Sequence, residues 1–322
     1  MMRWGRATVP PLRDWTVLGR PVGEWPYLAL MTLGGVNAVK QGVVRPVDLP
    51  VEWGVAAGQL LIGLSALGVV VSTLVGQRVG LRLLWVFAAA SCVTAPLVTA
   101  AIVGAPVVDS VITAIVAAIL VSGIVWYGRR RLHAAITRRV WPQVLAEHAA
   151  AADEFVATIG ALSLAQWNVR PTAEGWSPAE ITDHLARTYS QYAGESRGKN
   201  PMRIRLRLPQ RILIRALVKP RLLNGAPFPK ARAPRALRPA SGPETPADGV
   251  ALFRAAGAAC VRDLSLLAER RPHRQLIHPY FGALPLYDLV RFAAHHVRHH
   301  RRQLLAAVAT PQHQEGSHDH TP

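Results

Sequence analysis

The stretch FAAHHVRHHRRQLL, residues 292–305, holds four histidines within six positions. Drawn as a helix at about 100° per residue, the segment gathers its apolar side chains on one side. These side chains are Leu286, Leu289, Ala293, Val297 and Leu304. His300 falls within this apolar arc and His296 at its margin, whereas His299 lies further round and His295 lies with the arginines on the opposite, solvent side. His296 and His300 are therefore the inward pair, and their i, i+4 spacing stacks two imidazoles on one helix face.

Two imidazoles need a third ligand from another helix to make a metal site. Ser177, Pro178 and Glu180 have the spacing of a helix start, with Ser at the N-cap, Pro at the first position and Glu closing a capping box. The helix is predicted over residues 177–194, with His184 beside its apolar side. Three histidines with an open coordination position are typical of a zinc or nickel site. Two other interpretations stay open: a solvated His/Arg face, and core histidines held by hydrogen bonds.

The remainder of the C-terminal half has the periodicity of helices. The chain is predicted to be helical from 128 onward, and Pro142 either kinks this helix or starts a new one. Two more helices are predicted over 246–269 and 285–308, and strand signals are weak everywhere. Four helices with one long connection indicate an all-α domain of the four-helix-bundle type.

Three motifs in this half resemble the DinB/YfiT-like superfamily. They are GWS-x-x-E-x-x-x-HL at 175–185, HP-x-FG-x-L at 278–284 and H-x-x-x-H-x-x-Q-L at 296–304, with a Pro-rich connector, APFPKARAPRALRP, at 226–239. The resemblance covers residues 143–308 and implies a four-helix bundle with a three-histidine divalent metal site. By motif position it implies the ligands His184, His296 and His300. Pro285 departs from the pattern, because a Ser or Thr often caps the last helix of such proteins; the departure concerns the helix start and not the ligands.

The resemblance also implies two reaction types, hydrolysis and low-molecular-weight thiol S-transfer, each on a small-molecule substrate. A His-bound divalent cation lowers the pKa of a bound water or thiol. The expected cofactors are therefore Zn or Ni and, for S-transfer, the thiol. Gln303 and Asp288 are candidates to orient the metal ligands by hydrogen bonds. The alternative is a non-catalytic metal-binding or sensor module tethered to the membrane.

Neighbouring polar residues receive structural roles. Glu180 is assigned to the helix cap, Asp183 to solvent and His278 to a turn. Cys92 and Cys260 have no partner at the spacing of a metal site or a disulfide framework, so both are read as free thiols of a reducing compartment.

The N-terminal half is apolar enough to enter a membrane. Four runs reach the length that a helix needs to span a bilayer, about 20 residues: 25–44, 53–75, 83–103 and 107–127. The first run is the weakest, because Asn37 and Lys40 lie in its second half. Lys40 and Asp109 both lie near an interface, so the sequence favours an anchoring bundle over a transporter.

Arginines set the expected orientation. They are frequent before the first run and after the fourth, and with four spans these segments fall on one side. The expectation is a multi-pass protein of the inner (cytoplasmic) membrane with both termini cytoplasmic. A homo-oligomer is compatible with this arrangement.

The net charge of +18 includes an acid-free basic insertion at 197–238. Its second part, QRILIRALVKPRLL, suits an amphipathic helix. The chain has no recognised nucleic-acid motif and no interleaved aromatics, so no nucleic acid is expected. A cytoplasmic segment tethered to a bilayer meets anionic inner-leaflet lipid. The expected lipid contacts are Arg203, Arg205, Arg207, Arg211 and Arg215.

The expected domain organisation follows from these segments. Residues 1–24 form a cytoplasmic N-terminal segment and 25–127 the four transmembrane helices. Residues 128–142 form a basic juxtamembrane linker. Residues 143–308 form the DinB-like bundle, and 309–322 a disordered tail that contains histidines.

Overall fold

The computed structural model is mostly helical, as the sequence predicts. It describes residues 16–17, 20–21, 25–44, 50–101, 107–172, 175–199, 201–203, 206–229 and 232–309. Most of the predicted segment 1–24, the end of the third predicted span, Arg205 and the tail from 310 lie outside the described residues. The chain divides into two compact units, Met1–Arg139 and Val140–Pro322.

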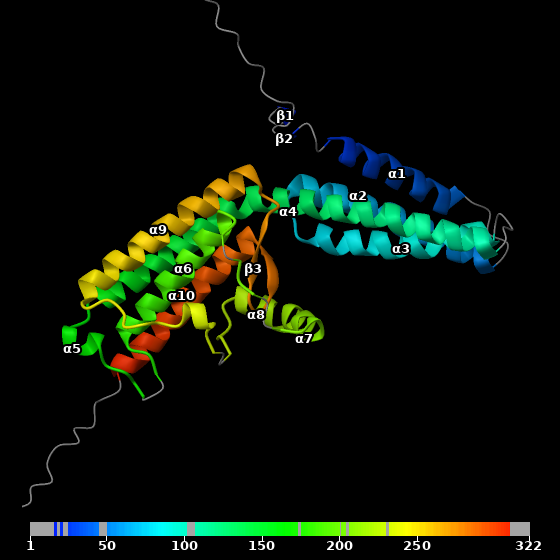
Figure 1. The fold of residues 1–322 in the computed structure, drawn as a ribbon. Helices are drawn as coiled ribbons and strands as arrows, with labels where there is room; N and C mark the ends of the chain where they lie inside the picture. The colour runs from blue at the N-terminus through cyan, green and yellow to red at the C-terminus, as the bar shows by residue number, and fades with distance from the viewer. Residues whose placement is uncertain are drawn as a thin grey trace, which may run out of the picture. The chain divides into compact units, whose positions relative to one another are not determined.

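The first unit is built on long apolar helices (Figure 1). They are α1 (Trp25–Val44), α2 (Pro50–Val75), α3 (Val79–Ala101) and the first part of α4 (Val107–Gly160), preceded by the short antiparallel strands β1 (Thr16–Val17) and β2 (Arg20–Pro21). Helix α2 packs against both α1 and α3. Large apolar side chains face outward, as Leu33 (72% exposed) and Ile119 (66% exposed) illustrate. A contiguous apolar exterior is the property that a lipid environment requires.

Three segments among the described residues are long and apolar enough to cross a membrane. They are Glu52–Val75, Val79–Val98 and the part of α4 that begins at Val111. Helix α1 has 20 residues but is not one of the three.

Glycines of α2, among them Gly58 of the G-x-x-x-G at 54–58, allow close approach to its neighbours α3 and α1. In the G-x-x-x-G of α2, a Cβ on Gly58 would collide with Thr94 of α3, whereas a Cβ on Gly54 would meet nothing within 4 Å. A Cβ on Gly63 would lie 2.7 Å from the carbonyl oxygen of Gly35, so α1 and α2 also depend on a small residue for their close approach.

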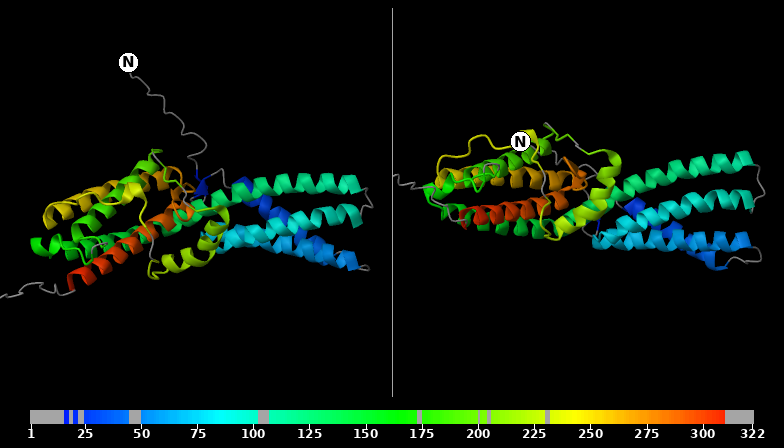
Figure 2. Two further views of the ribbon diagram at one scale, coloured as in Figure 1. Left: turned by 60° about the horizontal axis from the view of Figure 1, so that its bottom comes forward. Right: turned by 90° about the horizontal axis from the view of Figure 1, so that it is seen from below.

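The long helices of the second unit pack side by side, which Figure 2 shows from two directions. The end of α4 packs with α6 (Pro178–Ser196), α9 (Pro246–Arg270) and α10 (Leu286–Ala309), and α5 (Leu164–Trp167) lies between α4 and α6 along the chain. Phe155 of α4 packs on Phe253 of α9, with ring centroids 4.8 Å apart. Tyr189 of α6 also packs on Phe253, so one aromatic cluster joins three helices.

Ion pairs tie α10 to α4, which corrects the expected solvent face. Arg291 pairs with Glu147 at 3.1 Å and Arg298 with Glu154 at 3.2 Å. The helical wheel assigned these arginines to open solvent, whereas the structure places them at the edge of the α4–α10 contact.

Residues 128–142 are helical, as the sequence predicts, and Pro142 lies inside α4 without starting a new helix. One feature differs from the sequence prediction. A two-stranded antiparallel hairpin, β3 (Gln275–His278) with β4 (Gly282–Pro285), precedes α10. Each strand has only four residues, too few for an alternating pattern to stand out.

The basic insertion contains a run of short helices. It comprises α7 (Leu208–Leu213), the π-helical turn η3 (Ile214–Val218) and α8 (Lys219–Leu223), and the 3₁₀ turn η4 (Arg235–Leu237) follows. Pro220 has no N–H, and its ring excludes the carbonyl of residue 216 from a normal α-turn. The chain responds with a wider turn, in which the N–H of Lys219 bonds to the carbonyl of Ile214.

Candidate metal centre

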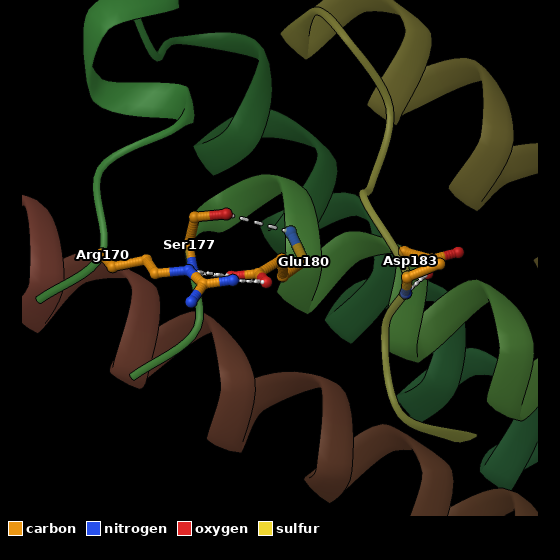
Figure 3. A network of polar contacts seen from close by, with 5 residues as sticks. Arg170, Ser177, Glu180 and Asp183 are labelled. Carbon is orange, nitrogen blue, oxygen red and sulfur yellow. Dashed lines mark hydrogen bonds and ion pairs between the residues drawn. The ribbon is translucent and has the colours of Figure 1, made fainter. Parts of the chain in front are cut away.

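Helix α6 presents His184 from a well-fixed N-terminus. The Ser177 hydroxyl accepts from the Glu180 N–H, and the Glu180 carboxylate accepts from the Ser177 N–H at 2.9 Å, which is the predicted capping box (Figure 3). Arg170 adds an ion pair to the same carboxylate, with Nε 3.0 Å from Oε2. His184 follows four residues after Glu180 and is buried.

Helix α10 presents the other two histidines. His296 and His300 lie one turn apart, with their Nε2 atoms 3.0 Å apart. The Nε2 of His184 lies 3.4 Å from that of His296. The three histidines thus bring one nitrogen each into a cluster in which the atoms lie within 4.8 Å of one another, an arrangement that could hold a metal ion. His184 and His300 are buried and His296 is half-buried.

The outer nitrogens of two of these rings have fixed partners. Nδ1 of His184 lies 2.6 Å from the carbonyl oxygen of Leu237, and a carbonyl can only accept, so this nitrogen carries the hydrogen. Nδ1 of His300 lies 2.8 Å from Oε1 of Gln303, which accepts in the same way. A neutral imidazole has one N–H, so Nε2 of both rings presents a lone pair to the centre. This donor set fits a divalent cation bound by imidazole.

The surroundings favour neutral rings. Burial lowers the pKa of His184 below its ordinary value, although Leu237 and Asp183 act in the opposite direction. Burial lowers the pKa of His296 and of His300 well below the ordinary value, and the neighbouring histidines of the cluster add to the effect. Neutral histidine is the form that ligates metal, so the site is prepared for a cation without first losing protons.

Asp183 has a role that the sequence did not reveal. It was assigned to solvent, but it is buried, and its Oδ2 accepts from Arg187 Nε at 2.7 Å. The same oxygen of Asp183, which Figure 3 labels, accepts from the Ala240 N–H at 2.9 Å. Ala240 directly follows the Pro-rich connector, residues 226–239, that carries Leu237. The carboxylate therefore holds to α6 the segment whose carbonyl orients His184.

Two aromatic side chains flank the histidines and were also missed as site residues. Trp176 lies against His184, with ring centroids 4.9 Å apart, and stacks on His300 at 6.2 Å. Phe228 of the connector lies 5.7 Å from His296 and stacks on His299 at 4.9 Å. Both belong to motifs quoted above, the GWS segment and the connector, so a signal existed in the sequence.

The other predicted residues have the following positions. Asp288 forms an ion pair with Lys219 at 2.7 Å, so its support of the ligands stays a prediction. His278 is buried at the end of β3, and its Nδ1 accepts from the N–H of Tyr280 and of Phe281 in the turn of the hairpin. His299 packs on Phe228, outside the cluster.

Comparison with known proteins finds one family model that matches most of the second unit. The family model of the DinB superfamily matches residues 147–304, which include all three clustered histidines. The resemblance found in the sequence is thereby confirmed for these residues, and the N-terminal region has no assigned family. A search of curated proteins and a search of solved structures each found no match.

Proposed function

We propose, from the DinB-superfamily domain at residues 147–304, that His184, His296 and His300 hold one divalent metal ion, with zinc or nickel favoured by the three imidazole donors. The protein would be a membrane-anchored enzyme acting on a small electrophile, by hydrolysis or by transfer of a low-molecular-weight thiol. One observation carries the proposal. The Nδ1 atoms of His184 and His300 are committed to Leu237 and Gln303, which leaves their Nε2 lone pairs aimed at a common centre.

When bound, a divalent ion would supply the acidity that turns a water or a thiol into a nucleophile near neutral pH. The residues of the chain have separate tasks. Leu237 and Gln303 fix the tautomers and orientations of two ligands. Trp176 and Phe228 place apolar rings against the histidine cluster, which would limit the access of bulk water.

The domain boundaries and the membrane arrangement belong to the same proposal. The N-terminal part would be a bundle of four transmembrane helices, with α1 as the first span, and the C-terminal part a DinB-like four-helix bundle in the cytoplasm. The arginine distribution supports this orientation. Both termini are then cytoplasmic, and the protein is a multi-pass protein of the inner membrane.

Metal content of the purified full-length protein tests the site. After dialysis against a weak chelator, the wild-type protein should retain one divalent ion per chain. The variants His184→Ala, His296→Ala and His300→Ala should each lose it. Removal of a ligand should lower the metal affinity by more than the roughly 10–100-fold that is typical when a residue hydrogen-bonded to a ligand is replaced. His295→Ala and His299→Ala are the matched controls on the same helix and should retain the metal. Retention in the first three variants, with helix content intact by circular dichroism, would contradict the proposal.

Activity separates the enzyme from the sensor module. Mass spectrometry of the native protein identifies any bound low-molecular-weight thiol, and a panel of electrophiles is then offered with it. Turnover that disappears in the three ligand variants supports the enzyme. A metal-loaded protein that turns over neither hydrolase nor thiol-transfer substrates would favour the sensor module.

Reporter fusions test the topology. Fusions after Val44, Gly80, Ala105 and Ala135 should report outside, inside, outside and inside. A tag at Met1 should report inside with four spans. An external Met1 would leave only three spans and remove α1 from the proposed bundle.

A further inference from the structure

The short helices α7, η3 and α8 have a polarity opposite to that of an ordinary surface helix. Between residues 208 and 220, every exposed side chain except that of Gln210 is apolar. These residues are Leu208, Pro209, Ile212, Leu213, Ala216, Leu217 and Pro220. Leu208, Ile212, Leu213 and Leu217 are 58–60% exposed.

The charged side chains of Arg215 and Lys219 turn toward the protein. Nη1 of Arg215 donates to the carbonyl oxygens of Phe281 and Ala283 in the β3–β4 hairpin, both at 3.0 Å. Lys219 forms the ion pair with the buried carboxylate of Asp288 on α10. These bonds fix which face is inward, so the apolar face is held outward by specific contacts.

The outward face is continuous through the η3 turn. Residues 211, 214, 215, 218 and 219 are partly covered and 222 is buried, whereas residues 212, 213, 216, 217 and 220 between them are exposed. Leu213 and Leu217 are four residues apart, so they lie on the same side of the helical segment. Isolated exposed leucines are ordinary, but a continuous row on a helix indicates a partner or a membrane.

Charged residues at the ends of the segment indicate whether this face contacts another protein or a membrane. Arg203, Arg207 and Arg221 are exposed around the apolar row, and residues 197–238 contain no acidic side chain. A second copy of this surface would bring like charges together. An anionic lipid surface satisfies both features, with apolar side chains among the acyl chains and arginines at the headgroups.

We infer that α7, η3 and α8 form an interfacial membrane-binding surface that inserts Leu208, Ile212, Leu213 and Leu217 into a bilayer with acidic headgroups. Three helices of the same chain are long and apolar enough to cross a membrane, so the bilayer is present at high effective concentration. The expected arginine set changes accordingly: Arg203, Arg207 and Arg221 face the headgroups, whereas Arg215 serves the hairpin. This inference does not depend on the metal site.

Depth-dependent quenching in the full-length protein tests the inference. A fluorescent non-canonical amino acid replaces Leu213, and the protein is reconstituted in nanodiscs that contain phosphatidylglycerol. Spin-labelled lipid should quench the probe strongly, and aqueous iodide should quench it several-fold less than it quenches the same probe at Leu266. Leu266, on α9, is the matched control because it is also an exposed leucine.

Charge variants test the electrostatic part. The double variant Arg207→Glu, Arg221→Glu should reduce quenching by spin-labelled lipid, whereas Arg254→Glu, Arg270→Glu on α9 should leave it unchanged. Added salt should weaken the contact, because exposed charges are screened beyond about 8 Å at physiological ionic strength. Retained lipid quenching in the first variant would overturn the role of the arginines.

Two outcomes would overturn the inserted surface itself. One is equal access of iodide to the probes at Leu213 and Leu266. The other is protection of Leu213 from iodide without quenching by lipid, which would mean that another protein chain covers it. Repetition with the probe at Leu217 guards against a local effect of the replacement, because both positions belong to the same row.

Discussion

Asp183 of α6 accepts a hydrogen bond from the backbone N–H of Ala240 at 2.9 Å, across 57 positions of the sequence. The bond joins the helix that carries His184 to the connector that supplies the Leu237 carbonyl. His184 is therefore held from two directions, by its own helix and by a segment that the neighbouring aspartate anchors.

Asp183→Ala should lower the metal affinity by about 10-fold. This is the lower end of the range for replacing a residue that orients a ligand, because the aspartate acts only through the connector. The replacement also removes the hydrogen bond to the Ala240 N–H, at a cost of about 1 kcal/mol, because Ala240 is exposed and water can replace the acceptor. Arg187→Ala is the matched control, since it removes the ion pair with Asp183 but retains the bond to Ala240. Competition with a chromogenic chelator measures the affinities. Equal metal affinities in Asp183→Ala and Arg187→Ala would contradict the role of Asp183 in anchoring the connector.

Gly242→Ala should loosen the same connection by a steric route. Gly242 has φ +77°, and a Cβ there would lie 2.7 Å from the backbone of Ala179 on α6. Gly198 is a close control, because its φ is +81° but a Cβ would meet nothing within 4 Å. Both replacements carry the backbone strain of about 1–2 kcal/mol, and only Gly242→Ala adds the collision. Thermal unfolding and metal affinity should both fall further in Gly242→Ala than in Gly198→Ala.

Replacements of Gln303 should change the metal affinity according to how well the new side chain accepts a hydrogen bond from Nδ1 of His300. Gln303→Leu removes the acceptor 2.8 Å from Nδ1 and should reduce affinity by about 10-fold. Gln303→Glu offers a carboxylate, which makes the imidazole a better donor to the metal, and should bind at least as tightly as the wild type. The order Glu, Gln, Leu in chelator competition is the expected result. Tighter binding by the leucine variant would remove Gln303 from the site.

His148 should make the second unit sensitive to acid. Its ring is buried and lies 2.8 Å from the hydroxyl oxygen of Tyr189, and burial lowers its pKa from 6.5 to about 4. As the pH falls below 6.5, His148 becomes protonated in the unfolded chain but stays neutral in the folded chain. The stability present above pH 6.5 is therefore lost progressively toward pH 4. At pH 5, His148 should lower the free energy of unfolding by about 2 kcal/mol.

His148→Gln retains a partner for Tyr189 and cannot titrate, so its melting temperature should fall less than that of the wild type between about pH 7 and pH 5. Part of the fall should persist, because burial also lowers the pKa of His278, to about 3. Differential scanning fluorimetry of the full-length protein at the two pH values makes the comparison. Parallel falls in both proteins would exclude His148 as a source of acid sensitivity.

The parts of the fold that the sequence predicts are those set by neighbouring residues. Ser177, Pro178 and Glu180 specify a helix start through bonds within four positions, and the structure has that capping box. The periodicity of residues 286–304 similarly placed His300 among buried side chains on α10. A wheel cannot show what lies opposite, however, so the ion pairs of Arg291 and Arg298 with α4 were assigned to solvent.

The parts that the sequence did not predict depend on distant contacts. Leu237 contributes a carbonyl, a group that every residue has, so nothing in its side chain marks it as the partner of His184. The β3–β4 hairpin is too short for its alternation to be recognised. The inverted polarity of α7, η3 and α8 follows from bonds to the hairpin and to α10, which local pattern does not contain.

Cys260 on α9 gives the second unit an unexpected chemical robustness. It is the single cysteine after residue 92, it is 3% exposed, and burial raises the pKa of its thiol to about 12. Alkylating agents react with the thiolate, and almost none of this group is ionised in neutral solution. A domain that handled reactive electrophiles would therefore not inactivate itself by alkylation of this thiol, and any thiol that it consumed would have to come from outside the second unit.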